Sequence, residues 1–147
     1  MTDRIDVLRD LEQELGILVR RVRRVIGERA RTVDPDLHPA SYLLLAHLVH
    51  CGPSRASELA HVFDLDKGAV SRQVQHLAEL GLVARTPDPE DRRATLVEAT
   101  DAAMQRMEDV ADARRQRLAE QLTDWTAADL EQLVELLGRY NRTLERD

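Results

Sequence analysis

The sequence predicts a mainly α-helical fold with a small β-wing, and three observations lead to this fold class. Apolar residues follow a helical spacing at both ends of the chain. Two short helical segments joined by about four residues occupy the middle. Two alternating, strand-like segments with a charged loop between them follow at once. We therefore expect a helix-turn-helix and hairpin at 38–100, with helical arms at 1–31 and 101–147.

The composition is that of a globular chain. Hydrophobic residues make up 43% of the 147 residues and charged residues 33%, which excludes disorder of the whole chain. We expect no membrane association, because the first residues form no signal peptide and no apolar run approaches the ~20 residues of a membrane helix. Cys51 is the only cysteine, which fits a reducing compartment. We therefore expect a cytoplasmic protein.

The N-terminal arm is expected to be one long helix, from Arg4 to about Arg29. Its apolar residues are spaced 3, 4, 3, 4, 3, which is the spacing of a heptad seam. Two prolines and two aspartates within 32–39 end the helix. The seam consists of Leu8, Leu11, Leu15, Leu18, Val22 and Val25.

The C-terminal arm repeats this pattern after Thr100. A first helical stretch is followed by a second helix with Thr126 as N-cap and Asp129 in its first turn. Narrow seams fit helix pairing across a two-fold axis, so we expect 1–31 and 101–147 to form a dimerisation domain. Packing of the arms on each other within a monomer is the alternative. The second helix carries a seam of Leu130, Leu133, Leu137, Tyr140 and Leu144.

Three helices are expected between residues 39 and 80. Pro39 opens the first of them, and Ser54 can cap the second. Asp66 is a suitable N-cap for the third, which Gly81 terminates. The second and third helices have the plan of a helix-turn-helix.

The third helix has two different faces. An apolar face at i, i+4 and i+7 is expected to pack against the preceding helix, and it consists of Val70, Val74 and Leu77. The opposite face is short, polar and carries one guanidinium, which fits base edges and phosphates in a major groove of DNA. A merely solvated helix face is the alternative. This polar face consists of Gly68, Ser71, Arg72 and Gln75.

A hairpin follows the third helix. The segments LVART and ATLVEAT alternate as strands, and the loop PDPEDRR joins them. A helix-turn-helix followed by such a hairpin is a winged helix. Arg92 and Arg93 can reach a minor groove, whose negative potential favours an inserted arginine. Asp91 is placed to pair with Arg93 and orient its guanidinium; an ordinary hairpin with solvated charges is the alternative.

Charge alone does not predict a nucleic-acid partner. The net charge is −6, and residues 38–100 carry six basic and eight acidic side chains. Only the docking face must be positive, so the positions of the basic residues carry the argument. These residues are Arg55, Lys67, Arg72, Arg85, Arg92 and Arg93.

Residues 57–100 resemble the core of the MarR (multiple antibiotic resistance regulator) family. The motifs are SELA at 57–60, VSR at 70–72, GLV at 81–83, and a D-x-R wing at Asp91 and Arg93. The resemblance implies a homodimeric transcriptional regulator that binds a roughly palindromic site on double-stranded DNA. It implies a DNA-binding set of Ser54, Arg55, Lys67, Gly68, Ser71, Arg72, Gln75, Arg92 and Arg93, with Asp91 as wing support.

Three features depart from the family pattern, and one of them is the second wing strand, which ends VEAT where a leucine is usual. Asp64 stands where a glycine is common in the turn, and aspartate tolerates the left-handed conformation. Gly68, early in the third helix, lowers helix stability by up to ~1 kcal/mol relative to alanine. These departures affect fine specificity and leave every candidate DNA-contacting group in place.

The resemblance also implies a repressor that a small organic effector releases. By position, His38, Tyr42, His47 and an arginine of the RRVRR stretch, Arg24, are candidate effector-binding residues. An arginine can pair with a carboxylate ligand. A solvated helix face is the alternative for the arginines.

Other chemistries have less support. Cys51 has no nearby run of cations to activate its thiol, which favours a small semi-buried residue over a redox sensor. His47, His50 and Cys51 lie within one turn, but a zinc site needs a further ligand, so we expect no metal and no cofactor. No catalytic motif is present, so we expect no enzyme. The competing classes are a metal- or thiol-responsive regulator of the same fold and a winged-helix protein-interaction module without DNA binding.

Overall fold

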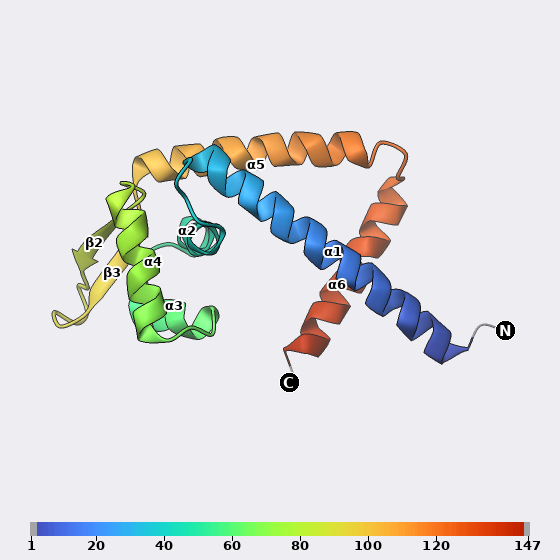
Figure 1. Ribbon diagram of the computed structural model, residues 1–147, viewed down its shortest axis with the longest axis horizontal. Coiled ribbons are helices and arrows are strands. Elements are labelled where there is room, and N and C mark those ends of the chain that lie inside the picture. Colours follow the sequence, from blue (N-terminus) through green and yellow to red (C-terminus); the bar gives the residue numbers. More distant parts are fainter. Residues whose placement is uncertain (1–2, 146–147) are drawn as a thin grey trace. The chain divides into compact units, whose positions relative to one another are not determined.

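The computed structural model describes residues 3–145 and shows a mainly helical chain (Figure 1). Its strands form one three-stranded antiparallel sheet. It confirms the fold class that the sequence predicts, a winged helix-turn-helix with helical arms. None of the described helices is long and apolar enough to cross a membrane. The elements are α1 (Arg4–Val33), α2 (Pro39–Cys51), β1 (Ser54–Arg55), α3 (Ala56–Val62), α4 (Lys67–Glu79), β2 (Val83–Pro87), β3 (Thr95–Ala99), α5 (Asp101–Gln121) and α6 (Ala127–Leu144).

The chain divides into two compact units, Met1–Val110 and Ala111–Asp147, and the boundary falls inside α5. The first unit contains α1, the winged helix-turn-helix and the first half of α5. The second contains the rest of α5 and α6. The expected division into a DNA-binding part, 38–100, and a dimerisation part, 1–31 with 101–147, concerns assembly and stays a prediction.

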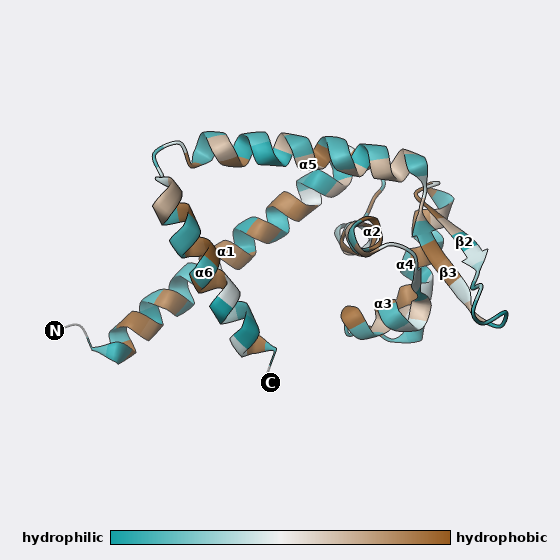
Figure 2. Ribbon diagram, turned by 180° about the vertical axis from the view of Figure 1, so that it is seen from behind, coloured by the Kyte–Doolittle hydropathy of each residue, from teal (hydrophilic) through white to brown (hydrophobic). Residues whose placement is uncertain are grey.

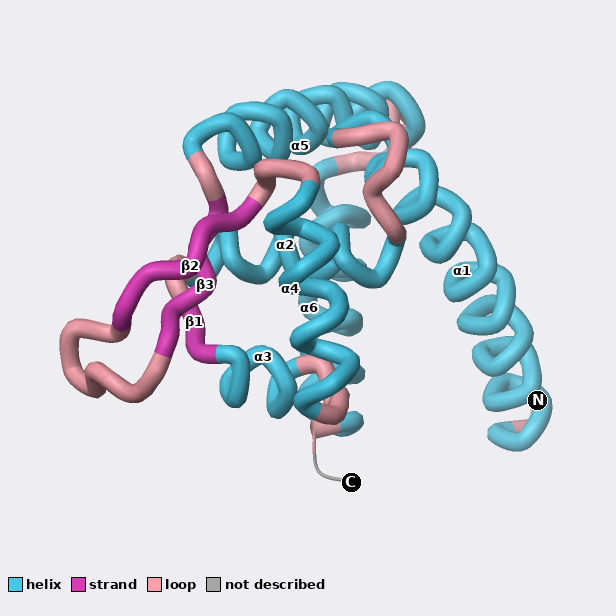
Figure 3. Tube along the Cα trace, turned by 60° about the vertical axis from the view of Figure 1, so that its left-hand side comes forward, coloured by secondary structure: helices cyan, strands magenta, loops and turns pink. Residues whose placement is uncertain are grey.

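The sheet has the strand order β1-β3-β2, and both pairings are antiparallel. Val97 at the middle of β3 pairs with Ser54 of β1 on one side and with Arg85 of β2 on the other. Figure 3 shows the three strands side by side, with the loop between β2 and β3 projecting beyond them. This loop is the wing.

The core of the first unit surrounds α2. Leu44 and Leu45 are fully buried, and the three apolar residues of α4 predicted to face inward, Val70, Val74 and Leu77, are buried as expected. Burying one such side chain stabilises the folded protein by about 1.5–3 kcal/mol relative to leaving it exposed to water. Packing of α4 on α2 and α3 therefore holds its opposite face outward.

The N-terminal helix is longer than the sequence indicates. It continues to Val33, which is buried, and it ends where Asp34 turns to an extended conformation ahead of Pro35.

The first half of α5 has one buried side. This side consists of Ala103, Met107 and Val110, whereas Met104 is 47% exposed.

The predicted seams are apolar but largely uncovered within the single chain. Figure 2 shows apolar residues recurring along α1 and α6. No residue of α6 is buried, and its N-cap Thr126 forms the predicted capping box with Asp129. The exposed seam residues include Leu8, Leu11, Leu18, Val22, Leu133, Leu137 and Leu144.

Candidate nucleic-acid interface

The start of α4 is held by local features that the sequence predicts. Asp64 has a φ of 49° and makes the turn between α3 and α4. Asp66 caps α4, because its Oδ1 accepts a hydrogen bond from the Ala69 backbone N–H at 2.7 Å. Gly81, with a φ of 70°, follows the end of the helix.

The outward face of α4 is exposed along its length. Ser71, Arg72 and Gln75 are all exposed, as is Gly68. A Cβ atom at Gly68 would lie 3.1 Å from Asp66 Oδ1 and 3.2 Å from Arg72 Nη1. The glycine therefore leaves room for the capping carboxylate and for the guanidinium, which gives this departure from the family pattern a structural reason.

Arg85 of β2 contacts this face, a role that the sequence does not reveal. Its Nη2 donates to Gln75 Oε1 at 3.3 Å, and Gln75 Nε2 donates to Glu79 Oε1 at 3.0 Å. The amide of Gln75 is thereby oriented from both ends. No sequence spacing signals this contact, because it depends on how β2 lies beside α4.

A hollow of about 270 Å³ lies between α4 and the sheet. Its polar lining residues are Ser71, Arg85 and Thr95, and its apolar lining residues are Ala56, Val74 and Val97. No carboxylate is among these lining residues. Hydroxyl and guanidinium donors of this kind bind phosphate oxygens.

The wing is anchored by Asp88, which sequence reasoning missed. Asp88 is only 4% exposed, and its Oδ2 lies 2.6 Å from Arg55 Nε. Its Oδ1 accepts from the Glu90 backbone N–H at 2.8 Å, and its own N–H donates to the Ala94 carbonyl. Asp88 therefore stabilises the loop through its contacts with Glu90 and Ala94, and it joins the loop to Arg55 at the start of α3.

These contacts change the ionisation of both partners. The Glu90 N–H and then the Arg55 guanidinium hold the pKa of Asp88 below its usual value. The hydrogen bond and the charge of Asp88 raise the pKa of Arg55. Both groups are therefore charged in the folded protein at neutral pH.

The predicted N-cap at Ser54 is wrong. Ser54 is buried, pairs with Val97 in the sheet, and its Oγ donates to the Gly52 carbonyl at 3.2 Å. Arg55 is the N-cap of α3, and its backbone N–H donates to Glu58 Oε2 at 2.7 Å. The short strand takes the position that the sequence assigns to the cap.

The predicted ion pair between Asp91 and the Arg93 guanidinium is also wrong. Asp91 Oδ1 accepts from the backbone N–H of Arg93 at 3.0 Å, and its carbonyl accepts from Ala94. Asp91 therefore supports the wing through the backbone, as aspartate does in tight turns. Arg92 and Arg93 are exposed at the tip.

We expect Asp88→Asn to lower the free energy of unfolding at pH 7, because the amide cannot replace the ionised partner of Arg55. The folded-state pKa of Asp88 lies below 3.8, so its ionised form contributes stability above this value. That contribution is lost as the pH falls through the folded-state pKa. Urea unfolding from pH 7 to pH 3 should show a wild-type advantage that is constant above about pH 4.5 and narrows below it.

Glu90→Gln is the matched control, since it removes an exposed carboxylate from the same loop. Its stability difference from wild type should stay small throughout. A wild-type advantage over Asp88→Asn that is equal at pH 7 and pH 3 would contradict this role of the Asp88 charge.

Comparison with known proteins decides the family. Residues 36–94 match the model of the MarR family. YxaD, an uncharacterised HTH-type transcriptional regulator of Bacillus subtilis (strain 168), is 35% identical over 132 residues, which are 90% of this chain and 91% of YxaD. The chain belongs to the MarR family.

Two further similar proteins are informative. The HTH-type transcriptional repressor NicR of Pseudomonas putida is 28% identical over 109 residues, which are 73% of this chain and 69% of NicR. A mutant MarR from E. coli, solved in complex with operator DNA, is 25% identical with a TM-score of 0.69 and covers 95% of this chain and 99% of its own. The winged core of this MarR-family chain thus has a structural counterpart seen on DNA.

The four candidate effector residues of this MarR-family chain lie in different settings. Tyr42 is buried in the core. His38 is exposed and stacks on His76 of α4, with ring centroids 4.2 Å apart. Arg24 is exposed, and its nearest carboxylate is Glu28 at 3.8 Å.

His47, the fourth candidate, lies beside Cys51. The Nδ1 of His47 is 3.7 Å from Cys51 Sγ, and its ring meets Phe63 edge-on at 5.6 Å. Among residues 3–145 there is no group of three or more His, Cys, Asp or Glu side chains that could hold a metal ion. The effector assignment of these residues stays a prediction.

Proposed function

We propose that this MarR-family transcriptional regulator acts as a homodimer that places one winged helix on each half of a roughly palindromic operator. The observation that carries the proposal is the joint exposure of the polar face of α4 and of the wing arginines. An α-helix fits the major groove of B-DNA, and an arginine fits an adjacent minor groove. The operator complex of the E. coli relative supports this mode of binding.

The proposed contacts divide between bases and phosphates. Ser71, Arg72 and Gln75 read base edges, while Lys67 and Gly68 approach the backbone at the N-terminus of α4. Arg93, with Arg92 beside it, enters the minor groove. Ser54 and Arg55 remain proposed phosphate neighbours, although the Ser54 hydroxyl and the Arg55 guanidinium are already engaged within the protein.

The hollow between α4 and the sheet adds a phosphate site to this set. Ser71 and Arg85 line it together with Thr95, and all three side chains carry hydrogen-bond donors. Because Arg85 also holds Gln75 through its Oε1, a phosphate in the hollow would sit beside a base-reading residue. Phosphate contacts of this kind set the register of a protein on DNA.

Dimerisation is supported by the uncovered seams. Leucine and valine side chains repeat along α1 and α6, and many are more than 40% exposed within one chain. Contiguous apolar surface of this kind marks an interaction site, and each Å² removed from water contributes about 25 cal/mol. The arms 1–31 and 101–147 therefore form the proposed dimerisation domain, with a second copy of the chain covering the seams.

Repression and release by an effector complete the proposal. NicR, one of the relatives, is a transcriptional repressor. A small organic acid or aromatic compound is the proposed effector. The proposed effector-binding residues are His38, Tyr42, His47 and Arg24.

The test is fluorescence anisotropy with the DNA upstream of the protein's own gene at two salt concentrations. We expect tight binding by two chains per duplex, weaker at the higher salt, because phosphate contacts release counterions. Arg93→Ala should weaken binding about tenfold or more, since one minor-groove guanidinium is lost from each protomer. Sedimentation of the complex gives the stoichiometry.

Arg117→Ala is the control for charge, because Arg117 is exposed on α5 outside the winged helix. It should bind nearly as wild type does. No binding to that DNA or to a random-site pool would contradict the proposal and favour a protein-interaction module.

A further inference from the structure

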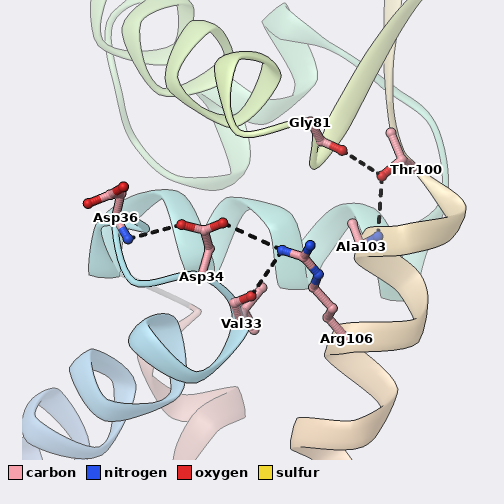
Figure 4. A network of polar contacts seen from close by, with 7 residues as sticks. All are labelled: Val33, Asp34, Asp36, Gly81, Thr100, Ala103 and Arg106. Atoms are coloured by element: carbon pink, nitrogen blue, oxygen red, sulfur yellow. Dashed lines mark hydrogen bonds and ion pairs between the residues drawn. The ribbon is translucent and has the colours of Figure 1, made fainter.

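A polar network joins the ends of three helices in the first unit (Figure 4). Thr100, directly before α5, donates from Oγ1 to the carbonyl of Gly81 at 2.9 Å. The same oxygen accepts from the Ala103 backbone N–H at 3.2 Å, and the Thr100 N–H donates to the Leu82 carbonyl. One residue thus caps α5 and holds the segment that terminates α4.

Arg106, one turn further along α5, holds the end of α1. Its Nη1 donates to the carbonyl of Val33 at 3.3 Å and lies 3.5 Å from Asp34 Oδ2. The other oxygen of Asp34 accepts from the Asp36 N–H at 3.0 Å. A guanidinium at the last carbonyl of a helix also complements the helix dipole.

A separate contact connects the same regions. His38, the N-cap of α2 just after α1, stacks on His76 in the last turn of α4, with an interplanar angle of 15°. The Nε2 atom of His76 is buried without a hydrogen-bond partner among the described residues. This contact is therefore one of ring packing, and it brings the start of α2 against α4.

Burial shows that the junction is packed while the arms are not. Ala30 and Val33 at the end of α1 are buried, as are Ala103 and Met107 at the start of α5. Beyond these turns the seam of α1 is exposed. Within the first unit, α1 is therefore packed against the winged core at its C-terminal end, and α5 at its N-terminal end.

We infer that Thr100 and Arg106 are positioning residues that set the direction in which the arms leave the winged core, and thereby the half-site spacing that the dimer accepts. The inference rests on the proposed function. A helix of about 20 residues is about 30 Å long. A rotation of about 10° at its root moves the far end by about 5 Å, more than the 3.4 Å rise of one base pair.

The experiment measures affinity for operators whose two half-sites are moved apart or together by one and two base pairs. We expect the affinity of wild type to fall about tenfold when the spacing changes by one base pair, because the two α4 helices must meet successive major grooves. The affinity of the double variant Thr100→Val with Arg106→Gln should fall by less than about threefold for the same change in spacing. Its affinity for a single half-site should equal that of wild type.

Thr143→Val with Arg117→Gln is the matched control, since both residues are exposed on arm helices outside the junction. If the junction variant were merely less stable, its affinity would fall for operators of every spacing and for the single half-site alike. The single variants Thr100→Val and Arg106→Gln, each of which removes one of the two anchors, replace the double variant if circular dichroism shows that it is unfolded. They should give intermediate spacing preferences.

A spacing preference as sharp as that of wild type, in a folded junction variant, would overturn the inference and leave the proposed function standing. If wild type bound none of these operators, that result would overturn the proposed function itself, and the inference with it.

Discussion

Arg72→Ala is expected to lower the affinity for operator DNA by about 30-fold or more. A bidentate contact between an arginine and a base contributes about 1–3 kcal/mol of discrimination, and a dimer makes two of them. Arg72 is exposed in the middle of the outward face of α4, and its guanidinium lies over Gly68, where there is no side chain to displace it. The loss should be largest for the operator and small for unrelated DNA.

Anisotropy on the operator and on a scrambled duplex of equal length measures this difference. Arg72→Lys keeps the charge but not the two-pronged geometry, so it should recover non-specific binding and little of the specificity. Arg117→Ala controls for the loss of one positive charge. Equal losses on both duplexes would show that Arg72 contacts phosphate and reads no base.

Leu77→Ala is expected to destabilise the protein by about 2–5 kcal/mol, the usual range for a fully buried leucine. Leu77 has no exposed surface and lies on the inward face of α4. The cavity left by the substitution would lie between α4 and the core around α2. Because this packing holds the opposite face of α4 outward, operator affinity should fall together with stability.

Urea unfolding followed by circular dichroism gives the free-energy difference. Leu43→Ala is the matched control, because Leu43 is the same residue type and is 41% exposed on α2. It should cost less than about 1 kcal/mol, as surface substitutions usually do. A loss below 1 kcal/mol for Leu77→Ala would mean that the α4 contact with the core is loose.

Sequence patterns predict the elements of this fold because those patterns are local. The inward face of α4, its cap at Asp66, the left-handed turn at Asp64 and the capping box of Thr126 each depend on residues within one or two turns of one another. Chain geometry links such residues whatever the rest of the protein does. Each of these predictions is confirmed.

Local patterns do not predict the contacts of side chains whose partners depend on distant segments or on the backbone of a turn. Its position before a helix favours Ser54 as an N-cap, but pairing with β3 draws it into the sheet. The spacing of Asp91 and Arg93 favours a contact with the Arg93 guanidinium, but the turn of the wing presents the Arg93 N–H instead. In both cases backbone hydrogen-bonding needs outrank the side-chain contact that the spacing suggests.

The anchors of the site depend on tertiary structure. Asp88 pairs with Arg55 across 33 residues, Arg85 meets Gln75 across 10, and Arg106 reaches Val33 across 73. The sequence determines which faces are polar, where helices begin and end, and which family the motifs resemble. Which charged group meets which partner is decided by the packing of separate elements, because a salt bridge or hydrogen bond acts only over a few ångströms and sequence distance does not encode that proximity.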